Sequence, residues 1–230
     1  MGTSWEEIEG MAVTYIKNDP ELDFNLANRR PVFFNTMTAF MKLAVPLFNR
    51  PPEILVKLRD HTEPDFGDVE IELQEITAGE FTADTGLTGY DICSAGIITE
   101  DKFGRMVYEP VKVTGYDSTA GTVTMNGNYP AGTVITVECY KGAEFRAELN
   151  DTEKQILAYA IYDVYEHRFD NDVLERMMKI NDRNFTTRSE AGHMQANTAR
   201  QKEVDRQLWG MMRAYQDNIE YLNIVKNTNY

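Results

Sequence analysis

Cysteine and histidine are scarce in this 230-residue chain, which limits the kinds of site it can build. Two cysteines, Cys93 and Cys139, are too few for a disulfide scaffold and lack the spacing of metal ligands. We interpret them as two partly buried thiols in a reducing compartment. Three histidines, His61, His167 and His193, stand far apart. Their spacing indicates no metal site, although it leaves a histidine-based zinc site open.

Long apolar runs, a signal peptide and the common catalytic motifs are also missing. No run of eighteen apolar residues occurs, so no membrane-spanning helix is expected. Residues 1–7 lack the basic-then-apolar layout of a signal peptide, so we expect a protein that stays in the compartment where it is made. Neither a phosphate-binding glycine loop, nor a nucleophile elbow, nor a His–Glu metal motif is found. The sequence therefore predicts no enzyme, no catalytic residue and no cofactor.

Acidic residues are in excess, and the excess lies in the middle of the chain. The chain has 37 acidic and 23 basic residues and a net charge of −14. Residues 61–150 hold 16 of the acidic and 5 of the basic residues. A surface of this sign repels phosphate, so the segment is not expected to bind nucleic acid. It can still line a passage through which nucleic acid moves without sticking.

Helical periodicity dominates the N-terminal part of the chain. Ser4 followed by Glu7 fits a capping box in front of an amphipathic helix. Residues 19–23 place carboxylates at alternate positions, but the pattern fails as a calcium loop and is interpreted as a solvated turn. A second, very apolar helix is expected to start at Pro31.

Helical periodicity returns after residue 150. Asn150 with Glu153 fits another capping box, and the helix that follows is expected to precede a shorter one near residues 173–180. Residues 181–197 are polar and predict a linker. A last, long helix is expected over about residues 198–226. Its apolar residues are spaced alternately four and three positions apart, so they line one face of the helix. We call this line of residues the seam: Leu208, Met212, Tyr215, Ile219 and Leu222.

The segment between the two helical blocks alternates with period two. Residues 54–59 and 69–73 both read as strands, and turn-rich stretches separate further candidates. Five to seven antiparallel strands are expected. Residues 77–106 are weaker and fit either a long loop or short strands.

These patterns together predict an α+β fold. Residues 1–53 and 147–230 are expected to form one helical bundle domain, built by the N- and C-terminal helices. Residues 54–146 are expected to form an acidic antiparallel β domain inserted into that bundle.

Three aromatic residues near the C-terminus do not belong to the apolar seam. Trp209 is adjacent to Leu208 and therefore points about 100° away from it on a helix. Tyr221 and Tyr230 also fall outside the seam. Exposed aromatic side chains are common at interfaces, so these three residues are candidates for docking a partner.

One short motif invites a catalytic interpretation. Asp84–Thr85–Gly86 is the triplet of aspartic proteases, but its neighbours are polar and give no hydrophobic strand-turn setting. We interpret the triplet as loop sequence. An enzyme whose site is assembled from unmarked acidic residues is kept as a less favoured alternative.

Five segments carry a resemblance to a known family: the opening helix from Ser4, the very apolar second helix, the β segment, the helix that begins near Glu153 and the long last helix. Together they resemble the head–tail connector, or adaptor, proteins of tailed bacteriophages. The resemblance implies a virion protein, held in the host cytoplasm before assembly. It implies a ring of typically twelve subunits below the portal, around the channel through which DNA passes without specific binding. The portal and tail-side neck proteins would be its partners, and residues 208–230 would dock on the portal. The alternatives are another phage neck, tail or baseplate component, or a non-viral interaction protein.

Overall fold

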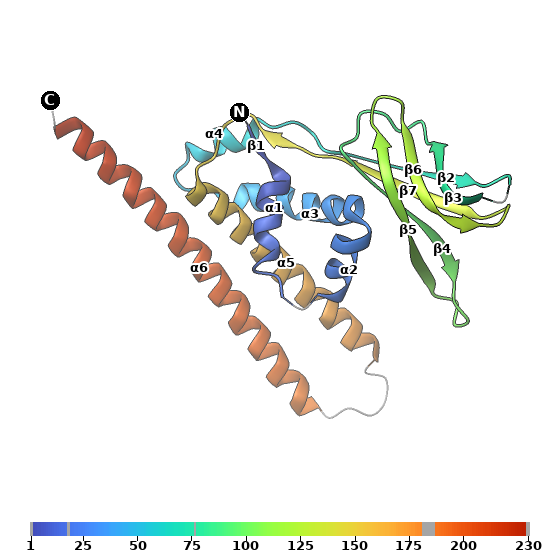
Figure 1. The fold of residues 1–230 in the computed structure, drawn as a ribbon. Helices are drawn as coiled ribbons and strands as arrows, with labels where there is room; N and C mark the ends of the chain where they lie inside the picture. Colours follow the sequence, from blue (N-terminus) through green and yellow to red (C-terminus); the bar gives the residue numbers. More distant parts are fainter. Residues whose placement is uncertain (1, 18, 76, 181–186, 229–230) are drawn as a thin grey trace. The chain divides into compact units, whose positions relative to one another are not determined.

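The structure is a computed structural model that describes residues 2–17, 19–75, 77–180 and 187–228. Figure 1 shows the course of its elements. In chain order they are β1 (Thr3–Ser4), α1 (Trp5–Val13), α2 (Pro20–Asn28), α3 (Arg30–Ala44), the 3-10 helix η1 (Val45–Leu47), α4 (Ile54–Arg59), β2 (Asp65–Glu72), β3 (Thr77–Asp84), β4 (Ile92–Glu100), β5 (Met106–Asp117), β6 (Thr122–Tyr129), β7 (Val134–Lys141), β8 (Glu144–Phe145), α5 (Asp151–Ile180) and α6 (Thr187–Thr228).

Residue contacts divide the chain into two compact units. The sheet unit comprises Asn18–Thr38 and Thr62–Glu144. The helical unit comprises Met1–Lys17, Ala39–His61 and Phe145–Tyr230. The division falls inside α3, so the first part of this helix belongs to the sheet unit and its last turns belong to the helical unit.

The sheet unit is built on six antiparallel strands in the order β2-β7-β4-β5-β6-β3. The sheet is strongly curled, as the green and yellow strands of Figure 1 show. Apolar residues from four of the strands and the turn after β2 meet in one core, which consists of Leu73, Ala95, Val111, Val123, Met125, Ile135, Val137 and Cys139. Period-two alternation places these side chains on one face, since successive strand residues point to opposite sides.

Strand β7 is buried on its other face too, because helical residues of the same unit cover it. The ring of Phe34 stacks on that of Tyr140 with 5.7 Å between centroids. The Thr38 and Tyr140 hydroxyls are hydrogen-bonded at 2.8 Å. The Arg29 guanidinium forms an ion pair with Glu138, whose side chain is only 5% exposed. A buried carboxylate needs such a partner, so Arg29 fixes how α2 and α3 lie on the strand.

The predicted fold class is wrong in its architecture. The molecule is α+β, but a curled six-stranded antiparallel sheet dominates it, and the terminal helices do not form one bundle with an inserted β module. The physical reason lies in the apolar stripe of α3. Phe33 and Phe34 are buried in the sheet unit, whereas Phe40 and Met41 are buried in the helical unit. One continuous stripe thus serves two cores, and the N-terminal helical block is divided between them.

The division also differs from the predicted domain boundaries of 1–53 with 147–230, and 54–146. Residues 18–38 belong with the sheet, and residues 54–61 belong with the helices. The strand predicted at residues 54–59 is wrong, because this segment is helix α4. Only Ile54 and Leu58 are buried there, at the i, i+4 spacing that one helix face requires.

Local capping signals explain where several helices begin. The capping box predicted at α5 is confirmed: Asn150 N donates to Glu153 Oε2 at 2.8 Å, and Glu153 N donates to Asn150 Oδ1 at 2.9 Å. The solvated turn predicted at residues 19–23 is wrong. Asp19 caps helix α2 through its side chain, and Pro20 occupies the first helical position, where its missing N–H costs nothing.

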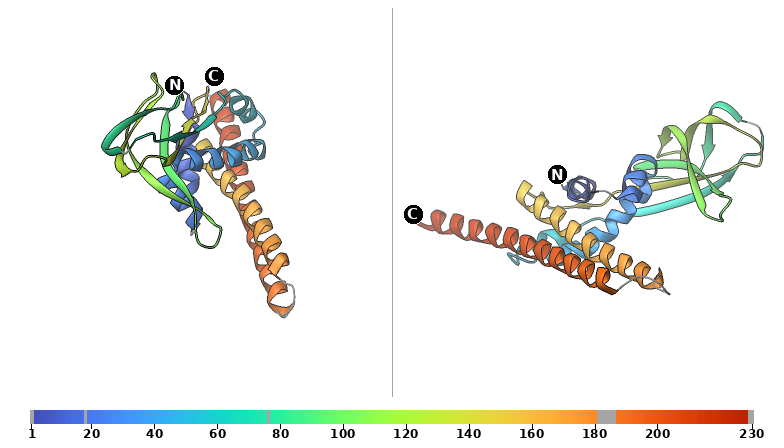
Figure 2. Two further views of the ribbon diagram at one scale, coloured as in Figure 1. Left: turned by 90° about the vertical axis from the view of Figure 1, so that its right-hand side faces the viewer. Right: turned by 90° about the horizontal axis from the view of Figure 1, so that it is seen from below.

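The helical unit has its own core, in which Trp5 is fully buried. Its ring lies 5.0 Å from that of His61 and 5.4 Å from that of Phe145. Helices α5 and α6 lie side by side in both views of Figure 2. Among the described residues, no helix is long and apolar enough to cross a membrane.

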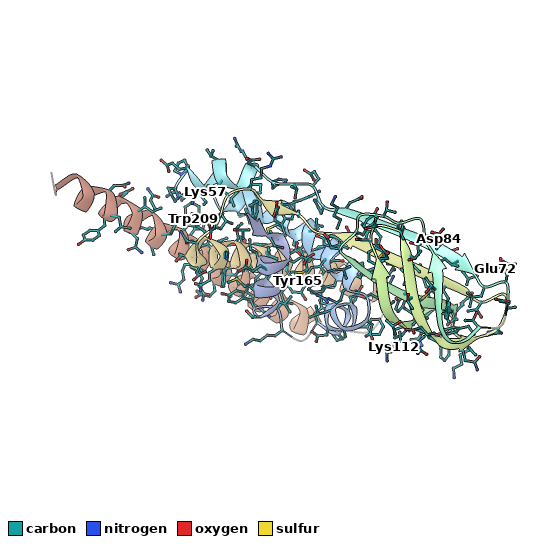
Figure 3. All side chains as sticks on the ribbon, turned by 45° about the horizontal axis from the view of Figure 1, so that its top comes forward. Lys57, Glu72, Asp84, Lys112, Tyr165 and Trp209 are labelled. Atoms are coloured by element: carbon teal, nitrogen blue, oxygen red, sulfur yellow. A yellow bond between two sulfur atoms is a disulfide. The ribbon has the colours of Figure 1, made fainter. Side chains whose placement is uncertain are left out.

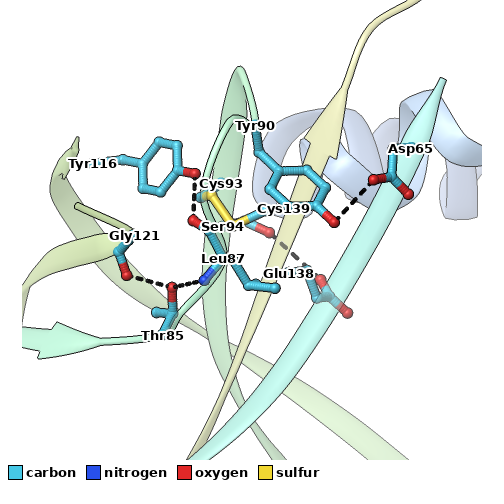
Figure 4. Close-up of a disulfide and its surroundings, with 10 residues drawn as sticks. All are labelled: Asp65, Thr85, Leu87, Tyr90, Cys93, Ser94, Tyr116, Gly121, Glu138 and Cys139. Carbon is cyan, nitrogen blue, oxygen red and sulfur yellow. Dashed lines mark hydrogen bonds between the residues drawn. A yellow bond between two sulfur atoms is a disulfide. The ribbon is translucent and has the colours of Figure 1, made fainter. Parts of the chain in front are cut away.

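The two cysteines form a disulfide, so their interpretation as thiols is wrong. Cys93 on β4 and Cys139 on β7 are register partners on neighbouring antiparallel strands, with their Cα atoms 4.1 Å apart. Figure 4 shows the bond beside Ser94 and Glu138. The sequence could not reveal this pairing because 46 residues separate the cysteines, and only the strand order brings them together.

Residues 77–106 contain strands β3 and β4 rather than a long loop. The Asp84–Thr85–Gly86 triplet, which begins on the last residue of β3, makes structural hydrogen bonds. Asp84 Oδ1 accepts from Gly86 N at 3.0 Å, and the buried Thr85 hydroxyl donates to Gly121 O at 2.7 Å. Gly86 has a φ of 65°, which favours glycine. The triplet is thus a turn tied to the loop between β5 and β6, as Figure 4 shows in part.

Candidate functional site on the terminal helix pair

Helix α6 presents a buried seam over only part of its length. Val204, Leu208 and Met212 are 5%, 3% and 2% exposed. Further along, Ile219 is partly buried and Leu222 is 55% exposed. The predicted seam is therefore correct at Leu208 and Met212 and wrong at Leu222, because the apolar spacing continues beyond the point where side chains of the unit cover it. Figure 1 shows the C-terminal end of α6 extending past α5.

Two of the predicted docking residues, Trp209 and Tyr221, are exposed on this helix. Trp209 is 49% exposed, although Leu208 beside it is buried, as the helical geometry requires. The Arg50 guanidinium lies 4.6 Å from the centroid of the indole ring. Tyr221 is 65% exposed. Figure 3 labels Trp209 on α6, and Tyr230 lies outside the described residues. We call these exposed side chains, Trp209, Tyr221 and the neighbouring Leu222, the aromatic surface of α6; steps of 100° place them about 100–140° apart around the helix axis.

Polar contacts hold α6 antiparallel against α5. The Tyr159 hydroxyl donates to Gln207 Oε1 at 2.6 Å, and Arg200 Nη2 donates to Glu166 Oε1 at 2.7 Å. The Glu166 side chain is 6% exposed, so Arg200 compensates a carboxylate that water barely reaches.

One cluster between these helices has the composition of a metal site. His167 Nε2 lies 3.0 Å from Asp205 Oδ1 and 3.6 Å from Asp163 Oδ1. The three ligand atoms lie within 4.8 Å of one another. The Asp163 side chain is 7% exposed, whereas those of His167 and Asp205 are about half exposed.

The electrostatics of the cluster are unusual for a helix interface. Burial, together with the hydrogen bond and charge of Asp205, raises the pKa of Asp163 to about 6, while His167 opposes the shift. Two carboxylates facing each other in a partly dry site disfavour double ionisation. A cation between them would relieve this repulsion.

The sequence prediction of no metal site did not anticipate this cluster. Asp163 and His167 are four residues apart on one helix, which places both on the same face. The spacing of four residues between Asp163 and His167 was the signal in the sequence that could have indicated this part of the cluster. Asp205 comes from α6, however, and only the packing register of the two helices brings it to the pair.

No protein-family model, no curated protein and no solved structure matches this chain. Its function is therefore inferred from the side chains described above.

Proposed function

We propose that this chain is a structural subunit of a tailed-bacteriophage head–tail connector, which forms a ring below the portal. The observation that carries the proposal is the aromatic surface of α6. Trp209, Tyr221 and Leu222 are each about half exposed or more on a 42-residue helix whose seam is covered only in part. Aromatic side chains provide large contact area at low entropic cost, which suits a docking surface.

Two features of the sheet unit support the proposal. Strand β2 carries an acidic outer face, with the exposed residues Asp68, Glu70 and Glu72 at alternate positions. Such a surface would let DNA pass without binding. The disulfide between Cys93 and Cys139 is a second support, because a particle outside the host cell is an oxidising environment in which this bond persists.

The test is assembly on a portal ring. The full chain would be mixed with the portal protein encoded in the same genome and imaged by negative-stain electron microscopy. We expect an added ring on the portal. The double variant Trp209→Ala/Tyr221→Ala, and a chain truncated after Asn223, should stay folded but fail to join the portal. Lys202→Ala is the control, since Lys202 is exposed on the same helix and lies about two turns before Trp209.

A genome without a portal gene would overturn the proposal. Full-affinity binding by both variants would show that the aromatic surface is not the contact. Nanomolar binding of duplex DNA at physiological salt would contradict a passage that does not bind DNA, and would favour a nucleic-acid-binding protein instead.

A further inference from the structure

We infer that Asp163, His167 and Asp205 form a binding site for one divalent transition-metal ion, of which Zn²⁺ is the representative, between α5 and α6. The inference rests on this cluster alone and does not depend on the proposed connector function.

The first argument is an unsatisfied buried atom. Asp163 Oδ1 is buried and has no hydrogen-bond partner among the described residues. It is the same atom that faces His167 Nε2 at 3.6 Å, a distance too long for a hydrogen bond. Buried polar atoms without partners are rare in folded proteins and point to a missing water or ion. Here the atom is aimed at the other two ligand atoms of the cluster.

A protonated imidazole alone does not satisfy the cluster. His167 Nε2 carries at most one proton, and Asp205 Oδ1 lies at hydrogen-bond distance to receive it. Asp163 Oδ1 would then remain without a donor. The arginines nearby are already used, because Arg200 pairs with Glu166 and Arg206 pairs with Glu203. A metal ion, in contrast, accepts all three atoms at once.

The distances suit a tetrahedral ion. Zinc ligands at about 2.0–2.1 Å from the metal lie about 3.4 Å from one another. The two separations at His167 Nε2 are 3.0 and 3.6 Å, on either side of that value. All three ligand atoms lie within 4.8 Å of one another, so side-chain rotations that bring the two carboxylates together would close the set around an ion.

The donor set selects the class of metal. One imidazole nitrogen with two carboxylate oxygens favours zinc and similar first-row ions, whereas magnesium and calcium prefer oxygen alone. Three protein ligands leave a fourth position for water. Because the side chains of His167 and Asp205 are 45% and 47% exposed, an ion can reach the site directly from solvent.

Metal titration of the full chain, after treatment with a chelator, tests the inference. Calorimetry with Zn²⁺ should give one site per chain with a micromolar or tighter dissociation constant. Titration with Co²⁺ should produce the visible absorption of a tetrahedral complex. Asp205→Asn and His167→Gln should each weaken binding at least tenfold. Asp217→Asn removes the same charge from an exposed position on α6 and should leave the affinity unchanged.

Circular dichroism of each variant separates loss of a ligand from loss of fold. Asp205 is half exposed, so Asp205→Asn is expected to keep the native spectrum. Equal Zn²⁺ affinity in Asp205→Asn, His167→Gln and Asp217→Asn would overturn the inference and leave a non-specific surface association only. Binding that is detectable only at millimolar Zn²⁺, or that Mg²⁺ displaces at equal concentration, would overturn it as well.

Discussion

The Tyr215 hydroxyl on α6 donates a 2.6 Å hydrogen bond to the buried carboxylate of Glu153, in the first turn of α5. The same carboxylate accepts from Lys57 Nζ of α4 at 2.7 Å and from Asn150 N at 2.8 Å. The Glu153 side chain is 1% exposed, so these three donors replace water entirely. One carboxylate therefore ties three helices of the helical unit together.

Replacing that carboxylate should destabilise the helical unit. Glu153→Gln keeps the shape but removes the charge that Lys57 and Tyr215 bind. We expect the free energy of unfolding to fall by about 1.5–3 kcal/mol, the range for a hydrogen bond to a charged group. Urea denaturation measures the change. Glu148→Gln is the control, because Glu148 is exposed, and it should stay within about 0.5 kcal/mol of wild type. Equal effects of the two substitutions would contradict the role of Glu153.

The ionisation of Tyr215 should make stability depend on alkaline pH. Burial, together with the hydrogen bond and charge of Glu153, raises its pKa to about 12. The unfolded pKa is about 10. A raised folded pKa means that the stabilisation is complete below pH 10 and is lost as the pH rises towards 12. The free energy of unfolding should therefore fall across this window.

Tyr215→Phe isolates this contribution from other tyrosines, since Tyr108 and Tyr159 also have pKa values raised to about 12. At pH 9 the variant should be less stable than wild type by about 1.5 kcal/mol, the low end of the range for a hydrogen bond to a charged group. The gap should narrow as the pH approaches 12. A gap that stays constant with pH would show that Tyr215 does not titrate in this window.

The disulfide should contribute to the stability of the sheet unit. Cys93 and Cys139 close a loop with a sequence separation of 46 residues, and a cross-link of this kind typically stabilises by about 2–4 kcal/mol. Cys93→Ala/Cys139→Ala should lose that amount in chemical denaturation. A reducing agent should lower the stability of wild type and leave the double variant unchanged. Two reactive thiols in the untreated protein would contradict the bond.

Local signals in the sequence were sufficient for some elements of the fold. The Asn150–Glu153 capping box acts over three residues, so the sequence predicts it and the structure confirms it. The stripe of α3 is different. Its periodicity shows that Phe34 and Phe40 are buried, but an apolar side chain packs equally well on a sheet or on a helix. The periodicity of α3 therefore could not show that its apolar stripe packs into two separate cores.

Neither the cluster of Asp163, His167 and Asp205 nor the disulfide could be predicted from the sequence, and the reason is the same for both. Each depends on a packing register between segments far apart in the chain: α5 against α6 for His167 and Asp205, and β4 against β7 for the cysteines. No local pattern encodes such a register. By contrast, the exposure of Trp209 follows from the 100° step between helix neighbours, so the sequence predicted it correctly.

Replacing leucine by alanine at two different positions of α6 tests where the buried part of the seam ends. Leu208 is 3% exposed and Leu222 is 55% exposed on the same helix. Leu208→Ala should cost about 2–5 kcal/mol, because it removes buried methyl groups and leaves a cavity. Leu222→Ala should change the free energy of unfolding by no more than about 0.5 kcal/mol, because water already reaches this side chain. Thermal and urea unfolding of both variants would measure the contrast. If Leu222→Ala proved as costly as Leu208→Ala in the isolated chain, the end of α6 would have to be covered by a second copy of the chain, and its stability would then depend on protein concentration.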